Sequence, residues 1–283
     1  MTDRYVVMGR PVAHSQSPFI HAAFARQTGQ DMSYGRLECP ADGFAATLRA
    51  FAADGGRGCN VTMPFKFDAW GLVHERTPRG ERAGACNALR LDAGHWLGDN
   101  TDGIGLLREV ERNAGVALAG KRILLLGAGG AAAGVLGPLL TAEPAELVLA
   151  NRTVERAVTL LDSHRAAVEA RRTGRVELRA ASLGDCGRGY DVVLNGTASS
   201  VSGAGVPVGP EVLAPGALAI DMMYGPAARP FVDWAAAHGA VARDGLGMLV
   251  EQAAEAFELF RGVAPQTAPV LAALRRHMDS GGT

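Results

Sequence analysis

Short apolar runs of β-type composition alternate with helical stretches over most of the chain. In the first third, the predicted strands are YVVMG (5–9), MSYGRLEC (32–39), GCNVTMP (58–64) and NALRL (87–91). The helices expected between them cover residues 18–27, 42–53 and 66–73. Strands that alternate with helices indicate an α/β protein whose mostly parallel sheets are covered by helices.

A second series of strands follows a helical segment expected at 103–113. Its predicted members are RILLL (122–126), ELVLA (146–150), VELRA (176–180), DVVLN (191–195) and ALAID (217–221). From about residue 245 the pattern becomes helical, because MLVEQAAEAFELF (248–260) spaces its apolar residues along one helix face. A chain of 283 residues is long enough for two domains with separate cores.

Charge and hydropathy exclude two classes of partner. The chain has 28 Lys and Arg against 29 Asp and Glu, and no dense basic run, so no nucleic acid is expected to bind. Its first ten residues, MTDRYVVMGR, lack the pattern of a signal peptide. The uncharged stretch 123–142 is long enough to span a membrane, but its glycines and Pro138 favour a strand, a turn and a helix. We therefore expect no membrane segment.

The cysteines indicate a reducing environment. Cys39, Cys59, Cys86 and Cys186 are scattered, without CxxC spacing or neighbouring histidines. This distribution fits free thiols that fill small apolar spaces in a cytoplasmic protein. No metal site is expected.

The sequence GAGGAAAG (127–134) directly follows the predicted strand 122–126. Gly127 permits a tight turn, and Gly129 lets the backbone approach a pyrophosphate held at the N-terminus of the next helix. Ala132 occupies the third small position of the G-x-G-x-x-G/A pattern. Alone the motif is weak, since such turns also arise from close packing. Its place between a strand and a helix favours a dinucleotide site.

The residues after the strand 146–150 indicate which dinucleotide binds. An NAD-binding domain usually carries an acid there for the ribose 2′-hydroxyl, whereas this chain has Asn151. Arg152, Thr153 and Arg156 follow, and they suit a 2′-phosphate. On charge alone, two solvated arginines would be an equally good interpretation. Their position at the ribose corner of the fold decides for NADP.

Polar residues of the first third cluster at the ends of predicted strands, where ligands of parallel sheets bind. They are Ser15, Ser17, Asn60, Thr62, Lys66 and Asn87, and Asp102 opens the following helix. Hydroxyls and amides with one cation and one anion suit a small polyhydroxylated molecule. Taken singly, Lys66 and Asp102 would more often be a solvated cation and a helix-opening acid.

Seven segments together resemble the shikimate dehydrogenase family. They are AHSQSP, NVTMPFK, LGDNTDGIGL, LLLGAGGAAAGVL, ANRTVERA, IDMMYGP and DGLGMLVEQAAEAF. The resemblance implies reversible, NADP-dependent reduction of 3-dehydroshikimate to shikimate in aromatic amino-acid biosynthesis. It also implies a substrate domain at 1–102, a Rossmann domain at 103–244, and helices at 245–283 that return to the substrate domain.

Reduction of a ketone by hydride leaves growing negative charge on oxygen. An ammonium aimed at that oxygen can stabilise the charge and supply the proton, and Lys66 is our candidate for this group. Asp102 would hold the lysine in place, favour its protonated form and accept a substrate hydroxyl.

The resemblance also assigns the remaining site residues. Ser15 and Ser17 would hold the substrate carboxylate. Ring-hydroxyl or pocket positions would be Asn60, Thr62, Asn87, Tyr224 and Gln252. The pyrophosphate loop would be Gly127, Ala128, Gly129, Gly130 and Ala131. The ribose-phosphate corner would be Asn151, Arg152, Thr153 and Arg156, and the nicotinamide side Thr197, Met222 and Gly245.

Two departures from the family pattern and two alternatives stay open. Ala88 stands where the family usually has threonine, and NGTASS (195–200) differs from the usual NATSSG. A relative that oxidises quinate or uses NAD is therefore one alternative, and a non-catalytic ligand sensor is the other. The retention of Lys66 and Asp102 favours an enzyme over a sensor. We expect a monomer or a homodimer.

Overall fold

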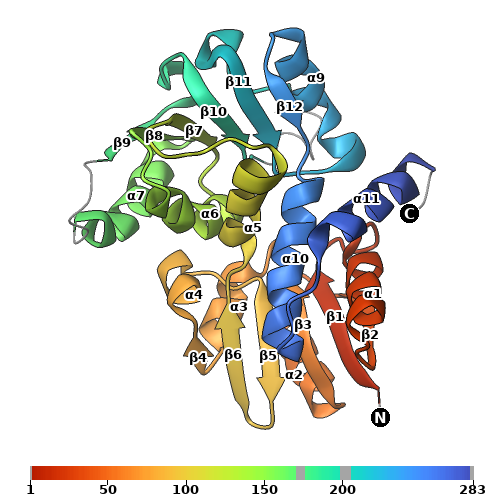
Figure 1. The fold of residues 1–283 in the computed structure, drawn as a ribbon. Coiled ribbons are helices and arrows are strands. Elements are labelled where there is room, and N and C mark those ends of the chain that lie inside the picture. The colour runs from red at the N-terminus through yellow and green to blue at the C-terminus, as the bar shows by residue number, and fades with distance from the viewer. Residues whose placement is uncertain (1, 170–175, 198–204, 281–283) are drawn as a thin grey trace. The chain divides into compact units, whose positions relative to one another are not determined.

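The computed structural model of the chain describes residues 2–169, 176–197 and 205–280. The chain forms two compact units (Figure 1). The first combines Met1–Leu106 with Leu249–Thr283, and the second is Leu107–Met248. The two-domain α/β fold class expected from the sequence is confirmed.

The first unit is built on a six-stranded mixed sheet with the strand order β2-β1-β3-β5-β6-β4. Its strands are β1 (Asp3–Gly9), β2 (Met32–Glu38), β3 (Gly56–Val61), β4 (Glu75–Arg76), β5 (Ala88–Asp92) and β6 (His95–Asp99). Its helices are α1 (Ser17–Thr28), α2 (Phe44–Ala53), α3 (Lys66–Leu72), α4 (Pro78–Ala83) and α11 (Thr267–Asp279), with most of α10 (Leu246–Arg261).

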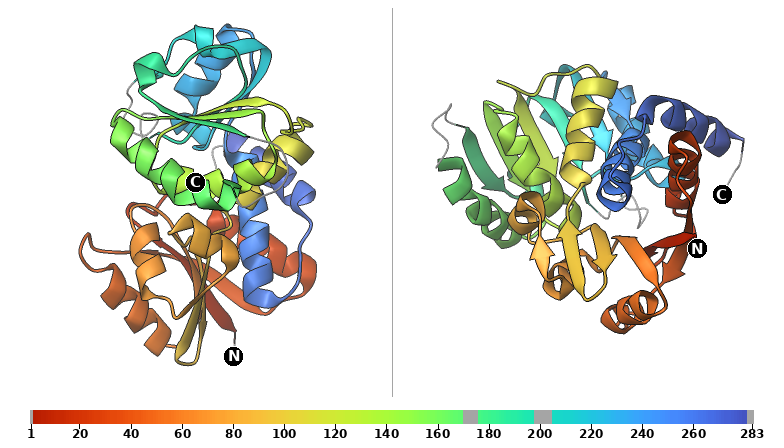
Figure 2. Two further views of the ribbon diagram at one scale, coloured as in Figure 1. Left: turned by 90° about the vertical axis from the view of Figure 1, so that its left-hand side faces the viewer. Right: turned by 60° about the horizontal axis from the view of Figure 1, so that its bottom comes forward.

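Helices cover both faces of this sheet. Figure 2 shows α2 and α3 on one face and α10 on the other. On the first face, Phe44, Leu48 and Ala69 pack against buried strand residues such as Met8. On the second face, Tyr5 packs against residues of α10 and stacks on Phe260 with ring centroids 5.0 Å apart.

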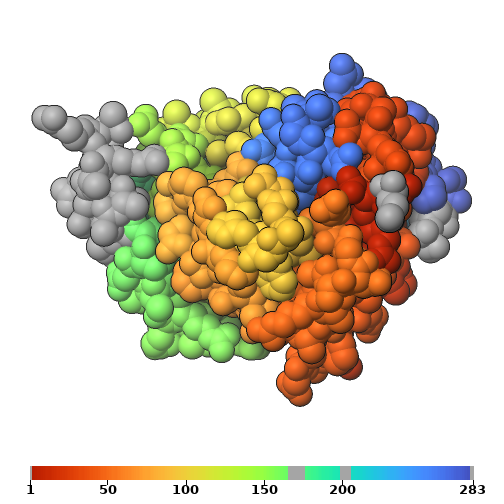
Figure 3. Space-filling model, turned by 90° about the horizontal axis from the view of Figure 1, so that it is seen from below, coloured from red at the N-terminus to blue at the C-terminus, as the bar shows by residue number. Residues whose placement is uncertain are grey.

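The C-terminal helices lie beside the N-terminal residues of the first unit. Figure 3 shows the C-terminal part of the first unit (blue) next to its N-terminal part (red). The Gln266 N–H donates to Gln27 Oε1 (2.6 Å), and Arg261 Nε donates to Gln30 Oε1 (2.8 Å). These hydrogen bonds join the C-terminal segment of the first unit to its N-terminal segment.

A hairpin in the first unit departs from the mostly parallel arrangement predicted above. Strand β5 runs antiparallel to both β3 and β6. The turn between β5 and β6 contains Gly94 with φ +77°, a conformation that favours glycine. The strand His95–Asp99 was not predicted, because its apolar and polar residues alternate only weakly.

The second unit has an all-parallel sheet with the order β12-β11-β10-β7-β8-β9. Its strands are β7 (Arg122–Leu126), β8 (Glu146–Ala150), β9 (Glu177–Ala181), β10 (Tyr190–Asn195), β11 (Leu213–Asp221) and β12 (Val241–Arg243). Its main helices are α6 (Gly130–Thr141), α7 (Val154–Glu169) and α9 (Arg229–Ala237). The strand order reverses direction at β7, the position at which open α/β sheets bind ligands.

The helix predicted at 103–113 is present in two parts. It consists of α5 (Asp102–Arg108) and a π-helical turn, η1 (Glu109–Asn113). The carboxylate of Glu109 is buried and pairs with Arg243 (2.6 Å). A Cβ at Gly247 would overlap that carboxylate, so a larger residue there would force Glu109 to move.

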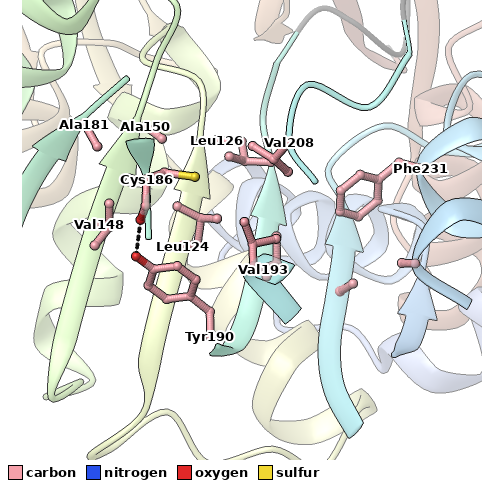
Figure 4. Packing of buried hydrophobic residues seen from close by; sticks show 13 residues of the cluster. Leu124, Leu126, Val148, Ala150, Ala181, Cys186, Tyr190, Val193, Val208 and Phe231 are labelled. Carbon is pink, nitrogen blue, oxygen red and sulfur yellow. Dashed lines mark hydrogen bonds between the residues drawn. The ribbon is translucent and has the colours of Figure 1, made fainter. Parts of the chain in front are cut away.

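The core of the second unit is built from its apolar strands. Figure 4 shows Leu124, Val148 and Val193, from three adjacent strands, in one buried cluster. The Tyr190 hydroxyl donates a hydrogen bond to the carbonyl of Cys186 in the same cluster.

All four cysteines are free and buried, as expected from their distribution. Burial raises the pKa of every one of these thiols, to about 12 for Cys86. Thiolate chemistry is therefore suppressed, and the cysteines act as core residues. Among the described helices, none has the length and apolar character needed to cross a bilayer.

Candidate active site

Lys66 is presented at the start of a helix that follows a central strand. Strand β3 ends at Val61, and the buried Phe65 anchors the loop that leads into α3. The Lys66 carbonyl accepts a hydrogen bond from the Cys86 N–H (2.9 Å), which fixes the first turn of the helix. The side chain of Lys66 then extends to Asp102, with Nζ 2.6 Å from Oδ2.

Asp102 begins α5, and both of its carboxylate oxygens are engaged. Oδ2 accepts from Lys66, and Oδ1 accepts from Asn87 Nδ2 (2.8 Å). The backbone N–H of Asp102 donates to Asn100 Oδ1 (3.2 Å). The side chains of Lys66 and Asp102 are only 16% and 8% exposed, so the pair is shielded from most of the solvent.

Asn87 connects three elements of the first unit. Its Nδ2 donates to Asp102 and also lies 3.1 Å from Oε1 of Gln252, which is on α10. Its Oδ1 accepts from the Thr101 N–H (2.8 Å). The structure thus brings four predicted site residues into one cluster, namely Lys66, Asn87, Asp102 and Gln252. The buried Thr101 belongs to this cluster and was missed, although it lies beside Asp102 in the GDNTDG motif.

Asn60 is held in one orientation by two neighbours. Tyr34 donates its hydroxyl hydrogen to Asn60 Oδ1 (2.7 Å), and Asn60 Nδ2 donates to the Asn87 carbonyl (3.2 Å). Burial raises the pKa of Tyr34 well above its ordinary value, so its hydroxyl stays protonated. Tyr34 was missed because nothing in its strand pattern sets it apart.

The two predicted serines lie together at the start of α1. Ser15 Oγ is 3.2 Å from Ser17 Oγ and accepts from the Ser17 N–H (3.3 Å). The Ser17 hydroxyl also lies close enough to Tyr34 to affect the pKa of the phenol. Ser17 and Asn60 therefore share a neighbour. Thr62 follows β3, where its N–H donates to the Met8 carbonyl (2.8 Å).

The glycine loop of the second unit has the geometry of a phosphate-binding turn. Gly127 has φ +98°, and a Cβ there would lie 2.9 Å from the Gly196 carbonyl oxygen. Gly129 precedes α6, and a Cβ on it would enter open space. The N–H groups of Gly130 and Ala131 are in the first turn of α6, where no helical carbonyl is available to them. The turn can therefore accept an anion such as a pyrophosphate.

The corner after β8 carries the residues predicted for ribose recognition. Asn151 Oδ1 accepts from the Ala128 N–H (3.3 Å), and Asn151 Nδ2 donates to the Thr153 carbonyl (2.8 Å). This amide joins the glycine loop to the start of α7. The side chains of Arg152, Thr153 and Arg156 are exposed around it. Two exposed guanidinium groups at this corner would suit a 2′-phosphate better than a hydroxyl.

The residues predicted for the nicotinamide side follow β10 and β11. Thr197 Oγ1 donates to Asn195 Oδ1 (2.7 Å), and Asn195 Nδ2 donates to the buried Asp221 (2.9 Å). Met222 is next in the chain, and its N–H donates to the Asn195 carbonyl (2.9 Å). A Cβ on Gly245 would lie 2.4 Å from the Met222 carbonyl oxygen, so only glycine fits.

Three further expectations can be placed in the structure. Tyr224 belongs to the second unit, and its contact with substrate stays a prediction. Ala88 is fully buried and packs with Tyr5, Ala256 and Phe260 in an apolar cluster. The position at which the family usually has threonine therefore lies in this apolar cluster, in contact with residues of α10. Of the divergent loop at 195–200, residues 198–200 lie outside the described residues.

Comparison with known proteins identifies the family. Residues 7–89 match the shikimate dehydrogenase substrate binding domain, residues 108–202 match shikimate / quinate 5-dehydrogenase, and residues 245–275 match the shikimate 5′-dehydrogenase C-terminal domain. The chain is 60% identical to a shikimate dehydrogenase (NADP(+)) of Methylibium petroleiphilum, over 99% of this chain and 97% of that protein. The chain belongs to the shikimate dehydrogenase family. The resemblance found in the sequence is thereby confirmed.

Two solved structures extend the comparison to the whole fold. A shikimate 5-dehydrogenase from Thermus thermophilus, in complex with NADP(H) and shikimate, matches with a TM-score of 0.84 and 32% identity, over 97% of this chain and 99% of that one. An Ael1 enzyme from Pseudomonas putida matches with a TM-score of 0.82 and 42% identity, over 96% and 98%. The arrangement of strands and helices is therefore that of the family.

Proposed function

We propose that this protein is an NADP-dependent shikimate dehydrogenase, which reversibly reduces 3-dehydroshikimate to shikimate. The observation that carries the proposal is the Lys66–Asp102 pair, 2.6 Å apart within a cluster of amides and hydroxyls. The strong likeness to a relative that bears this name supports it.

Lys66 is the proposed acid and base. In the direction of reduction its ammonium donates a hydrogen bond to the ketone oxygen, stabilises the developing charge and transfers a proton to it. The product is then a neutral alcohol. In the direction of oxidation, neutral Lys66 takes the proton back from the hydroxyl.

Asp102 orients Lys66 and binds substrate. Because one N–H of the ammonium points at Oδ2, the other two are available for the substrate oxygen. Asn87 fixes the carboxylate from the other side. We propose that Asn60, Thr62, Gln252 and Tyr224 contact ring hydroxyls, and that Ser15 and Ser17 hold the carboxylate.

The residues of the second unit fit NADP. The glycine loop offers space that a Cβ on Gly129 would fill, and the N–H groups of the first turn of α6 face the same region. Arg152, Thr153 and Arg156 would bind the 2′-phosphate. Thr197, Met222 and Gly245 would line the nicotinamide side. When bound, the reduced cofactor supplies the hydride.

An assay with four combinations tests this function. Purified protein is given shikimate with NADP, shikimate with NAD, and quinate with each cofactor, while the absorbance of the reduced cofactor is followed. We expect the highest kcat/KM for shikimate with NADP. Absence of turnover with every combination would contradict the enzymatic function and favour a ligand sensor.

Quinate is the second candidate substrate, because residues 108–202 match a family that includes quinate dehydrogenases. Quinate carries one more hydroxyl than shikimate on a saturated ring, so the same polar cluster can engage most of it. The two exposed arginines count against NAD as the preferred cofactor.

We place the reaction in the cytoplasm, as part of the pathway to chorismate and the aromatic amino acids. The four free thiols fit a reducing compartment. A monomer or a homodimer is proposed, and sedimentation of the purified protein tests it.

A further inference from the structure

Arg79 forms a partly buried ionic group with two acids, Asp99 and Glu255. It lies in α4 and binds both carboxylate oxygens of Asp99, with Nε 2.8 Å from Oδ1 and NH2 2.6 Å from Oδ2. Its third nitrogen, NH1, donates to Glu255 Oε1 (2.7 Å). Burial alone would lower the pKa of Arg79, but the two carboxylates outweigh it and raise that pKa. The arginine therefore bridges two acids from different elements.

The first arm of this bridge fixes the turn that leads to Asp102. Asp99 is the last residue of β6 and is 1% exposed. Besides Arg79, its Oδ1 accepts from the Thr77 hydroxyl and from the backbone N–H of Asn100 (2.7 Å). A buried carboxylate with four donors has a single favourable position. The orientation of the peptide after β6 is therefore set by the Arg79–Asp99 contact.

Asn100 passes this orientation on to the catalytic pair. Its Nδ2 donates to the Ala85 carbonyl (2.9 Å), and its Oδ1 accepts from the Asp102 N–H (3.2 Å). The start of α5, and with it the Asp102 carboxylate, is thus tied through Asn100 to Asp99. The chain of contacts contains no exposed link, since Asp99, Asn100 and Asp102 are all buried.

The second arm fixes α10. Glu255 is three residues after Gln252, so both side chains project from the same face of the helix. Gln252 contacts Asn87 and Thr101, and Glu255 contacts Arg79. Two sets of contacts therefore join α10 to the region of Asp99–Asp102, one through Arg79 and one through Gln252.

We propose that Arg79 is a positioning residue for Asp102 and Gln252, an inference that rests on the function proposed above. A bidentate contact between a guanidinium and a carboxylate, as Arg79 makes with Asp99, adds geometric specificity as well as energy. The two groups held in this way are Asp102, which orients the proton donor, and Gln252, which is proposed to bind substrate. Arg79 itself touches neither.

The two arms predict separable kinetic effects. Asp99→Asn weakens the arm to Asp102, so kcat falls while the KM for shikimate changes little. Glu255→Gln weakens the arm to Gln252, so the KM for shikimate rises while kcat stays near that of wild type. Arg79→Ala removes both arms and lowers kcat/KM for shikimate by up to about 10²-fold, as expected when reacting groups are displaced.

The experiment measures kcat, both KM values and the melting temperature for Asp99→Asn, Glu255→Gln, Arg79→Ala and Arg79→Lys. We expect Arg79→Lys to be intermediate, because an ammonium cannot bind two carboxylates in the planar geometry of a guanidinium. The KM for NADP should stay within about twofold in every variant, since no cofactor group is displaced. Arg90→Ala is the matched control, because Arg90 pairs with Asp92 at the exposed surface of the same unit.

Two results would overturn the inference. One is a folded Arg79→Ala protein with wild-type kcat and KM. The other, decisive where Arg79→Ala does not fold, is a Glu255→Gln protein whose KM for shikimate is unchanged. An inactive wild type would instead contradict the proposed function, so the two failures can be told apart.

Discussion

Lys66 Nζ and Asp102 Oδ2 are 2.6 Å apart, and they come from helices that begin after two different strands of one sheet. Strand β3 delivers the lysine and strand β6 the aspartate. The pairing with Asp102 explains why the buried strand β3 is followed by a cation, Lys66. The lysine is directed by an acid that is itself held by Asn87.

We expect Asp102→Asn to lower kcat by about 10²-fold, because the amide offers Lys66 an N–H or a weaker acceptor in place of a carboxylate. Asn87 can still bond to the remaining oxygen, so the fold should persist. Steady-state kinetics with shikimate measure the effect. Asp92→Asn is the control, as Asp92 is exposed. Equal kcat in the two variants would remove Asp102 from the mechanism.

The double substitution Arg152→Ala with Arg156→Ala should raise the KM for NADP by about 10- to 100-fold, since each charge-assisted hydrogen bond contributes about 1.5–3 kcal/mol. The KM for NAD should change far less. Arg229→Ala, at an exposed arginine of the same unit, serves as the control. Equal losses for both cofactors would show that the arginines do not select the phosphate.

Two glycine substitutions separate folding from cofactor binding. Gly127→Ala should destabilise the protein by about 1–3 kcal/mol, because φ is positive and the new Cβ meets the Gly196 carbonyl. Gly129→Ala should leave the melting temperature unchanged, since its Cβ enters open space, yet raise the KM for NADP. Wild-type NADP binding by Gly129→Ala would place the pyrophosphate elsewhere.

His21 predicts a pH dependence of stability. It is fully buried and stacks on Tyr34 with ring centroids 4.0 Å apart. Burial lowers its pKa from 6.5 to about 3. The unfolded chain therefore binds an extra proton below pH 6.5, and stability falls as the pH decreases from there towards 3.

His21→Phe should remove this dependence. Between pH 7.5 and 4.5, wild type should lose about 2–3 kcal/mol more than the variant, at about 1.4 kcal/mol per pKa unit. Urea unfolding at both pH values measures the difference, and the exposed His238→Asn is the control. Parallel losses in wild type and His21→Phe would mean that His21 is not held neutral.

The sequence predicted the second unit better than the first, for a physical reason. Fully buried parallel strands need continuous apolar runs, and 122–126, 146–150 and 191–195 are such runs. In the first unit, the hairpin strand His95–Asp99 alternates only weakly, and the strand Glu75–Arg76 has two residues. In the second unit, the three-residue strand Val241–Arg243 was not predicted. Short or half-exposed strands depend on their neighbours more than on their own composition.

The site residues also divide into those that the sequence could predict and those that it could not. Lys66, Asn87 and Asp102 could be found because they stand in distinctive motifs. Tyr34 and Arg79 could not, because each becomes important only through contacts with residues distant in the sequence. Tyr34 on β2 contacts Asn60 on β3 across the intervening strand β1. No local sequence pattern reveals this strand order.

The turnover of Lys66→Ala tests the central claim most directly. Shikimate oxidation by NADP is measured for wild type, for Lys66→Ala and for Lys121→Ala, the variant at the other lysine of the sequence. Binding of shikimate to each protein is measured by calorimetry. We expect Lys66→Ala to bind shikimate with modest loss and to turn over about 10²- to 10⁴-fold more slowly, while Lys121→Ala stays active. A Lys66→Ala protein that binds shikimate and turns over at the wild-type rate would contradict the claim.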